Sequence, residues 1–266
     1  MKLSRCVVTL ILVSISGVIP VSQARGAQNG RLELLGSFET LQSLGFTPDG
    51  VSYSPQGGRL MIAASSDSGV GARGVFEVTQ AGEFVESFSI PQSPTGLLGF
   101  SIKRASSGPH VNHFFMAEFT GLPTIRVFEF DPSFALVNSF PVTGTGSPGD
   151  GIAFNHVTQN LVVVDGGSNA LIEVTTSGDF VRMISIPNAH VVGLTFNQST
   201  GTYFGVDSGG ILKELSTDGE LLRSFDLTLF GVKNSVGIAS GQGKLFIADE
   251  GDPPNSGGAI FIFKLR

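Results

Sequence analysis

The chain has 266 residues, of which only 14% are charged, while 36 are glycine and 13 are proline. With 16 Lys and Arg against 22 Asp and Glu, the formal net charge is −6, and an acidic chain repels phosphate backbones. This composition excludes a coiled coil or a disordered chain and argues against nucleic acid as a partner. Frequent turn-forming residues together with 22 Phe favour many short strands.

The first 24 residues have the three-part pattern of a secretory signal peptide. Lys2 and Arg5 give a basic start, residues 6–19 are almost wholly apolar, and Ser22 and Ala24 are small residues that suit a cleavage site. The alternative is a retained membrane anchor, although an apolar run of roughly fourteen residues falls short of the roughly twenty that span a bilayer. We therefore predict an exported chain, periplasmic or extracellular, with no stable membrane insertion after cleavage.

Cleavage after residue 24 also changes what the mature chain contains. It removes two basic residues and no acidic one, so the mature chain becomes more acidic. It removes Cys6, the only cysteine, which excludes disulfides, thiol nucleophiles and cysteine-ligated metals from the remainder. Residues 25–30 are then a linker, and residues 31–266 are predicted to form a single domain.

Within that domain, four short apolar segments recur with a period of about 40–55 residues. One copy comprises residues 50–54, 59–64, 74–79 and 83–91, and its counterpart comprises residues 151–155, 160–165, 170–175 and 179–187. Each segment is rich in Val, Ile, Phe and Leu and is bounded by turn formers, which is typical of strands. The second segment is continuously apolar and the fourth alternates, which indicates an inner strand covered on both faces and an outer strand with one wet face.

Four such strands per repeat predict the blade of a β-propeller, with about five blades beginning near residues 50, 95, 150, 191 and 236. A β-sandwich is the alternative all-β fold, but it does not explain the repeat. The last repeat ends at Arg266 without a fourth segment, while residues 31–39 have no repeat of their own and match fourth segments elsewhere. We therefore predict that this N-terminal strand completes the C-terminal blade and closes the ring.

The repeats resemble NHL-type repeats and the wider group of propellers that includes gluconolactonase-like and TolB-like proteins. The likeness rests on the Gly-Ile-Ala openings at residues 151–153 and 237–239 and on second strands that end in Asp, at Asp165, Asp207 and Asp249. It covers nearly all of residues 31–266. It implies a fold shared by scaffolds, lyases and metal-dependent lactone hydrolases, and so leaves function open. The group usually has six blades, so five imply a narrower central channel.

Four aspartates are the candidate metal ligands: Asp49 and Asp150, which precede first strands, and Asp207 and Asp249, which follow second strands. Carboxylates gathered at the channel mouth would suit a divalent cation such as calcium. The competing explanation is that each carboxylate accepts hydrogen bonds within its own turn, because a residue repeated in every blade serves folding more naturally than a single site. No catalytic set can be assembled from the spacing of His110, His113, His156 and His190.

Two functions remain open from the sequence. The first is a non-enzymatic module that binds an unidentified protein or small-molecule ligand and requires no cofactor, which regular repeats without an assembled catalytic set favour. The second is a metal-dependent hydrolase or lyase at the channel mouth, with the four aspartates as ligands and a metal-activated water.

Overall fold

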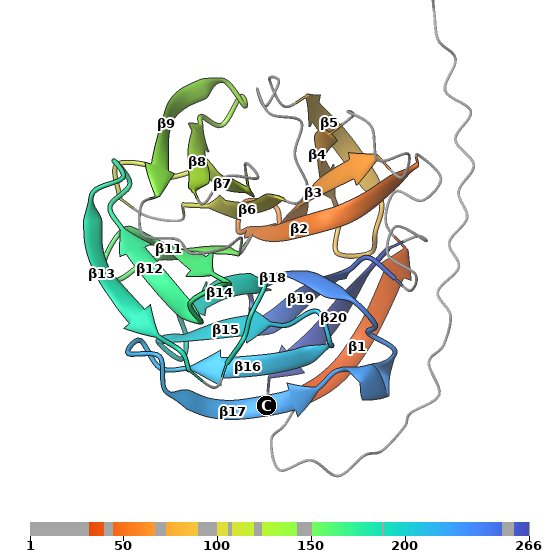
Figure 1. Ribbon diagram of the computed structural model, residues 1–266. Helices are drawn as coiled ribbons and strands as arrows, with labels where there is room; N and C mark the ends of the chain where they lie inside the picture. The colour runs from red at the N-terminus through yellow and green to blue at the C-terminus, as the bar shows by residue number, and fades with distance from the viewer. Residues whose placement is uncertain are drawn as a thin grey trace, which may run out of the picture.

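The computed structural model is a β-propeller of five four-stranded antiparallel sheets arranged around a common axis (Figure 1). The structure describes residues 32–39, 45–66, 73–89, 100–105, 108–119, 124–142, 151–187, 189–251 and 258–265. The predicted signal peptide and linker lie outside these residues. In the described part of the chain no helix is long and apolar enough to cross a membrane.

Each of the first four blades uses four consecutive strands, and the innermost strand always comes first. Blades 1 and 2 comprise β2 (Phe46–Ser54), β3 (Arg59–Ser66), β4 (Arg73–Val78) and β5 (Phe84–Ser89), then β6 (Phe100–Arg104), β7 (Phe114–Phe119), β8 (Ile125–Phe130) and β9 (Leu136–Val142). Blades 3 and 4 comprise β10 (Ile152–Asn155), β11 (Asn160–Asp165), β12 (Ala170–Val174) and β13 (Phe180–Ser185), then β14 (Gly193–Asn197), β15 (Thr202–Val206), β16 (Ile211–Leu215) and β17 (Leu221–Asp226). A 3-10 turn, η2 (Thr228–Phe230), leads to the fifth blade.

Blade 5 joins the two ends of the chain. Its strands are β18 (Ser235–Gly241), β19 (Lys244–Asp249), β20 (Ala259–Leu265) and β1 (Leu32–Glu39). β1 pairs antiparallel with β20, from Leu32 opposite Leu265 to Glu39 opposite Ala259, and Figure 1 shows the two strands side by side. The predicted five blades and the predicted closure by the N-terminal strand are therefore confirmed.

The core of the described residues lies between neighbouring blades. There are five buried apolar clusters, each shared by two adjacent sheets. The second strands are almost fully buried, whereas the outer strand β13 is mostly exposed, as the sequence pattern predicts. Because each blade buries both of its faces against its neighbours, the ring is held together by packing around its whole circumference.

Glycines bring the innermost strands together at the end of the channel where those strands begin, which we call the glycine end. A Cβ added to Gly193 would lie 3.0 Å from the Cα of Gly237, and one added to Gly237 would lie 2.8 Å from the Cα of Gly50. Side chains cannot be accommodated between backbones this close, so the repeated glycine at the start of an innermost strand follows from the tight five-bladed ring.

Candidate functional site

A cavity of about 550 Å³ lies at the opposite end of the channel, where the innermost strands end, and we call this the cavity end. Every blade contributes the last residues of its innermost strand, or the turn that follows, to the wall. The volume is within the range of pockets that hold small molecules. The five-fold convergence of strand ends therefore creates one shared site from five separate repeats.

The wall of this cavity is basic although the chain as a whole is acidic. Lys103, Arg104 and Lys244 line it together with His156, and none of the described lining residues is Asp or Glu. Aromatic rings, among them Phe154 and Phe196, supply the apolar part of the wall. Cations concentrated in a recess produce a positive potential in a protein of net charge −6. This arrangement suits an anionic ligand with an apolar face.

Lys103 reaches from β6 into the centre of the ring. Its side chain is buried, with 7% of the residue exposed, and its Nζ donates to the carbonyl oxygens of Val51, at 3.0 Å, and of Ile238. These acceptors belong to β2 and β18, so one ammonium group links the innermost strands of three blades. Burial lowers the pKa of Lys103 to about 7. The channel therefore gains or loses a positive charge near neutral pH.

Arg104 points its guanidinium toward the rim of the cavity. Its Nη atoms donate hydrogen bonds to Ser54, to Gln56 at 2.9 Å and to Asn112 at 2.9 Å. The Cζ atom of Arg104 lies 5.6 Å from the ring centroid of Phe114. Burial lowers the pKa of Arg104, and the Coulombic attraction of Glu77 partly opposes that effect. An arginine remains charged at all ordinary pH values because its reference pKa lies above 12. It is therefore a permanent positive charge in the wall.

Two buried polar atoms of the wall have no hydrogen-bond partner among the described residues: Nε of Arg104 and the hydroxyl of Tyr53. Burial raises the pKa of Tyr53, so its hydroxyl keeps its proton and can donate. The Tyr53 ring stacks on Phe246 with 5.8 Å between centroids, which fixes its direction. Buried donors are normally satisfied, so these two are candidate contacts for a ligand.

His156 forms part of an aromatic row on the same wall. Its ring lies 5.4 Å from the ring of Phe154 and 6.0 Å from that of Phe196. Burial lowers the pKa of His156. The imidazole is therefore neutral at neutral pH and extends the apolar face of the cavity.

The three described aspartates among the predicted ligands, Asp49, Asp207 and Asp249, are not part of the cavity wall and lie toward the glycine end. Asp249 accepts backbone N–H groups from Lys233 at 2.6 Å, Asn234 at 3.1 Å and Gly251 at 2.7 Å. Asp207 pairs with Lys213 at 2.7 Å and accepts the N–H of Ile211. The N–H groups of Ile211 and Gly251 are local turn contacts, as the structural explanation expects, whereas Lys213 on β16 and the segment before β18 supply the remaining contacts.

Of the other two predicted ligands, Asp49 and Asp150, the structure describes only Asp49. Asp49 is buried at a bulge of β2 and accepts the hydroxyl of Ser65 at 3.2 Å. Asp150 lies outside the described residues. Neither Asp49, Asp207 nor Asp249 belongs to a described group of three His or carboxylate ligand atoms close enough to share an ion.

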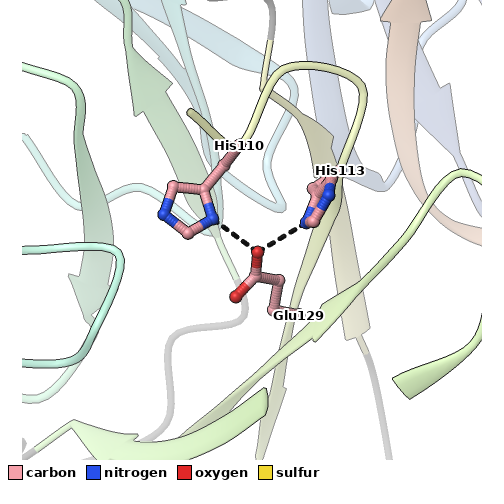
Figure 2. A group of neighbouring side chains, drawn as sticks. All are labelled: His110, His113 and Glu129. Atoms are coloured by element: carbon pink, nitrogen blue, oxygen red, sulfur yellow. Dashed lines mark hydrogen bonds and ion pairs between the residues drawn. The ribbon is translucent and has the colours of Figure 1, made fainter. Parts of the chain in front are cut away.

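The described part of the chain contains one such group, which was not predicted from the sequence: His110, His113 and Glu129 (Figure 2). From the sequence, His110 and His113 were named only among four histidines whose spacing gives no catalytic set. The available signal was a pair of histidines in the irregular second repeat, followed by the Glu that recurs in third strands. Lys103 and Arg104 were also missed, because a basic pair in a strand gives no sequence signal of a channel lining.

No protein-family model matches the sequence, and no curated protein is similar to it. Solved structures share the fold. A gluconolactonase from Xanthomonas campestris has a TM-score of 0.53 and 12% identity over 90% of each chain. A putative gluconolactonase has a TM-score of 0.51 and 17% identity over 90% of this chain and 94% of its own. In the structure of a nidogen–laminin complex, one chain has a TM-score of 0.53 and 17% identity over 77% of this chain and 73% of its own.

At identities this low the likeness shows the fold alone. In that sense the predicted resemblance to gluconolactonase-like and NHL-type propellers is confirmed. One of these structures is described as a gluconolactonase, one as a putative gluconolactonase and one as a nidogen–laminin complex. The function of the present chain therefore has to be argued from its own site.

Proposed function

We propose that this chain is a binding protein for a small anionic ligand, which occupies the cavity at the end of the propeller channel. The observation that carries the proposal is the cavity wall, with three basic side chains, no described carboxylate and two unpartnered buried polar atoms. An anion would be held by Arg104 and Lys244 at the rim. It would accept hydrogen bonds from Tyr53 Oη and Arg104 Nε, while the aromatic row contacts its apolar face.

The test is calorimetric titration of the purified chain with gluconate, glucose and inorganic phosphate at low ionic strength. Gluconate and glucose are close in size, so a preference for gluconate isolates the contribution of charge. We expect gluconate or phosphate to bind with a Kd of about 1 mM or tighter and glucose to bind at least about tenfold more weakly. Binding should weaken as salt is added. If neither gluconate nor phosphate binds, the proposal is wrong.

Lys244 offers a matched pair of variants. Lys244 lies in the cavity wall, and Lys264, directly opposite it in the β19–β20 ladder, is exposed outside the cavity. We expect Lys244→Gln to weaken anion binding about tenfold, the effect of losing one charge-assisted contact, and Lys264→Gln to leave it within about twofold. Equal effects of the two substitutions would mean that net charge, and not the cavity, determines binding.

A second candidate is a metal-dependent hydrolase or lyase that uses some of Asp49, Asp150, Asp207 and Asp249 as ligands. Its support is the fold shared with gluconolactonases. The contacts of Asp207 and Asp249 favour the structural explanation instead. The two are separated by melting the chain with calcium and with chelator, and by assaying lactone hydrolysis: turnover that Asp150→Ala abolishes would establish the enzyme.

We also propose that the chain is exported and cleaved after residue 24, on the strength of its N-terminal pattern. Expression of the full gene in a bacterial host, followed by fractionation and N-terminal sequencing, tests this proposal. A mature chain that begins near Arg25 in the periplasm or medium is expected. A full-length chain held in the membrane fraction would instead indicate a retained anchor.

A further inference from the structure

Blade 2 holds a second cluster of polar side chains, separate from the channel cavity. His110 and His113 lie in the connection between β6 and β7, and Glu129 lies on β8. The Nδ1 atoms of both histidines are 2.6 Å from the same carboxylate oxygen, Oε1 of Glu129. Figure 2 shows the two rings on either side of that oxygen, each directing a nitrogen at it. All three potential ligand atoms lie within 4.8 Å of one another.

We propose that His110 Nδ1, His113 Nδ1 and the Glu129 carboxylate form a binding site for a divalent transition metal ion of the zinc class. Two imidazole nitrogens and one carboxylate are ligands that zinc accepts at about 2.0–2.2 Å, with a fourth position left for water. Bonds of that length in a tetrahedron place ligand atoms roughly 3.3 Å apart. The carboxylate therefore has to retreat by less than about 1 Å from its hydrogen-bonded position to admit the ion.

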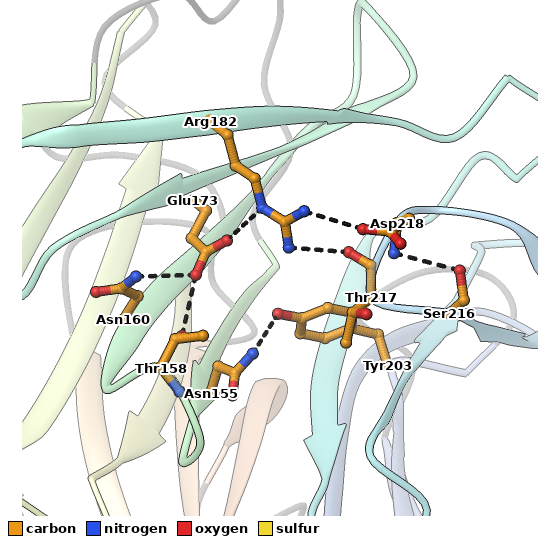
Figure 3. A network of polar contacts seen from close by, with 9 residues as sticks. All are labelled: Asn155, Thr158, Asn160, Glu173, Arg182, Tyr203, Ser216, Thr217 and Asp218. Carbon is orange, nitrogen blue, oxygen red and sulfur yellow. Dashed lines mark hydrogen bonds and ion pairs between the residues drawn. The ribbon is translucent and has the colours of Figure 1, made fainter.

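The comparison between blades explains why this position is special. The third strands of blades 3 and 4 carry a buried Glu at the equivalent position, and each pairs with an Arg from the fourth strand: Glu173 with Arg182, and Glu214 with Arg223. Figure 3 shows the first of these pairs within a wider network of hydrogen bonds. A guanidinium is always charged and offers no lone pair, so those two blades hold a salt bridge and cannot ligate a metal there.

Blade 2 keeps the Glu but exchanges the partner. The residue opposite Glu129 on the fourth strand is Asn138, where blades 3 and 4 have the Arg. Two imidazoles from the connection between β6 and β7 take the place of the guanidinium. One cationic side chain is enough to neutralise a buried carboxylate, as in blades 3 and 4. Two histidines directed at one carboxylate oxygen instead provide the ligands that a metal ion needs. The departure from the repeat is therefore where the ligands accumulate.

The loop that carries the histidines is held in place before any ion binds. The N–H of His113 donates to the carbonyl of His110 at 2.9 Å, and the N–H of Asn112 donates to Ala105 at 2.8 Å. The side chain of Asn112 accepts a hydrogen bond from Arg104 at 2.9 Å. Restraint of the residues beside metal ligands raises affinity, because less freedom is lost on binding.

Burial gives the site one dry side and one wet side. The Glu129 side chain is 2% exposed, whereas the side chains of His110 and His113 are 31% and 24% exposed. An ion can therefore enter from solvent past the two rings and keep a water ligand on the outer side. The buried carboxylate supplies negative charge in a region where it is weakly screened.

The experiment uses the full chain, stripped with chelator and then titrated with Zn²⁺, Co²⁺ or Ca²⁺ at pH 7.5. We expect one Zn²⁺ per chain, a melting temperature that rises with Zn²⁺ concentration, and no comparable effect of Ca²⁺, which prefers oxygen ligands. Co²⁺ should give d–d absorption bands that are much more intense than those of Co²⁺ in water, because a four-coordinate site has lower symmetry than the octahedral aqueous ion. Zn²⁺ binding that is absent, or Co²⁺ without such bands at saturation, would overturn the proposal.

The variants separate this site from adventitious binding. His113→Gln should weaken Zn²⁺ binding at least about a hundredfold, since it removes one of three ligands. His190→Gln is the matched control, because His190 is an exposed loop histidine outside the cluster, and it should leave binding unchanged. If His113→Gln does not fold, His110→Gln replaces it. Unchanged Zn²⁺ binding in the cluster variants, or an equal loss in the His190 variant, would show that the ion binds elsewhere.

Discussion

The two ends of the channel are built from the same five innermost strands, but they use polar side chains differently. At the glycine end, Asp207 pairs with Lys213 and Asp249 accepts backbone N–H groups, and the glycines of neighbouring innermost strands are in close contact. At the cavity end, basic side chains surround open space and two buried polar atoms have no partner among the described residues. The difference teaches that the aspartates repeated between blades are held by contacts within the fold. The candidate sites are built instead from residues that differ from blade to blade.

The strongest test of this comparison is Gly237→Ala at the glycine end. The new Cβ would lie 2.8 Å from Gly50 Cα and 3.1 Å from the nitrogen of Val51, and backbone atoms cannot rotate away. We expect the free energy of unfolding in urea to fall by about 3 kcal/mol, the upper part of the range for overpacking. Gly36→Ala in β1 of the same blade is the control, since its Cβ meets nothing within 4 Å. A similar loss in both variants would refute tight packing at this end.

Asp249→Ala examines the polar side of the same end. The Asp249 residue is 2% exposed and its carboxylate accepts three backbone N–H groups, which would be left without an acceptor. We expect a loss of about 2.5 kcal/mol in urea unfolding with anion affinity unchanged, and a smaller loss for Asp249→Asn, which keeps one acceptor oxygen. The comparison breaks if Asp249→Ala retains its stability but loses binding of a metal or an anion.

Gly241→Ala makes the corresponding change at the cavity end. Its Cβ would lie 2.1 Å from Cδ1 of Tyr53, and the Tyr53 ring can relieve this overlap only by giving up its stacking on Phe246 and turning toward the cavity. The expected cost in unfolding free energy is therefore about 1–2 kcal/mol, less than for Gly237→Ala. Displacement of Tyr53 should also weaken anion binding in calorimetry. Loss of stability without any change in anion binding would show that Tyr53 does not contact the ligand.

Lys103 is expected to have the smallest effect on the free energy of unfolding, and that effect depends on pH. Burial lowers the pKa of Lys103 from 10.5 to about 7, so between these values the unfolded chain holds a proton that the folded chain has released. Stability from this group therefore rises with pH through that window. Between pH 7 and 8 the free energy of unfolding should rise by about 1 kcal/mol more in the native chain than in Lys103→Met. Parallel pH profiles for the two chains would mean that Lys103 keeps an ordinary pKa.

The sequence predicts the fold well because periodic features determine it. Five repeats of four strands, the buried second strands and the closing role of residues 32–39 all follow from local patterns that the structure confirms. The repeated glycines mark strand starts in the sequence, but their reason, contact between neighbouring backbones around a narrow ring, is visible only in three dimensions.

Most residues of the candidate sites could not be predicted from the sequence, and the reason is again physical. The cavity is assembled from strand ends that are far apart in the chain, so Lys103 and Lys244 have no sequence relation that would link them. The cluster of blade 2 joins a loop to a strand across a β-hairpin, and its distinguishing feature is an Asn138 where two other blades have Arg. Repetition draws attention to Asp165, Asp207 and Asp249, whereas the informative residues are the exceptions.

The seam in blade 5 has a consequence for how the molecule is made. Among the described strands, the first, β1, pairs with the last, β20. A chain that is synthesised from its N-terminus can therefore form blades 1 to 4 early, but the ring cannot close until β20 has been made. Contacts between distant parts of a sequence form slowly. Until β20 is made β1 is an unpaired strand, and until the two have paired β20 is an open edge on which β1 of a second chain could pair instead.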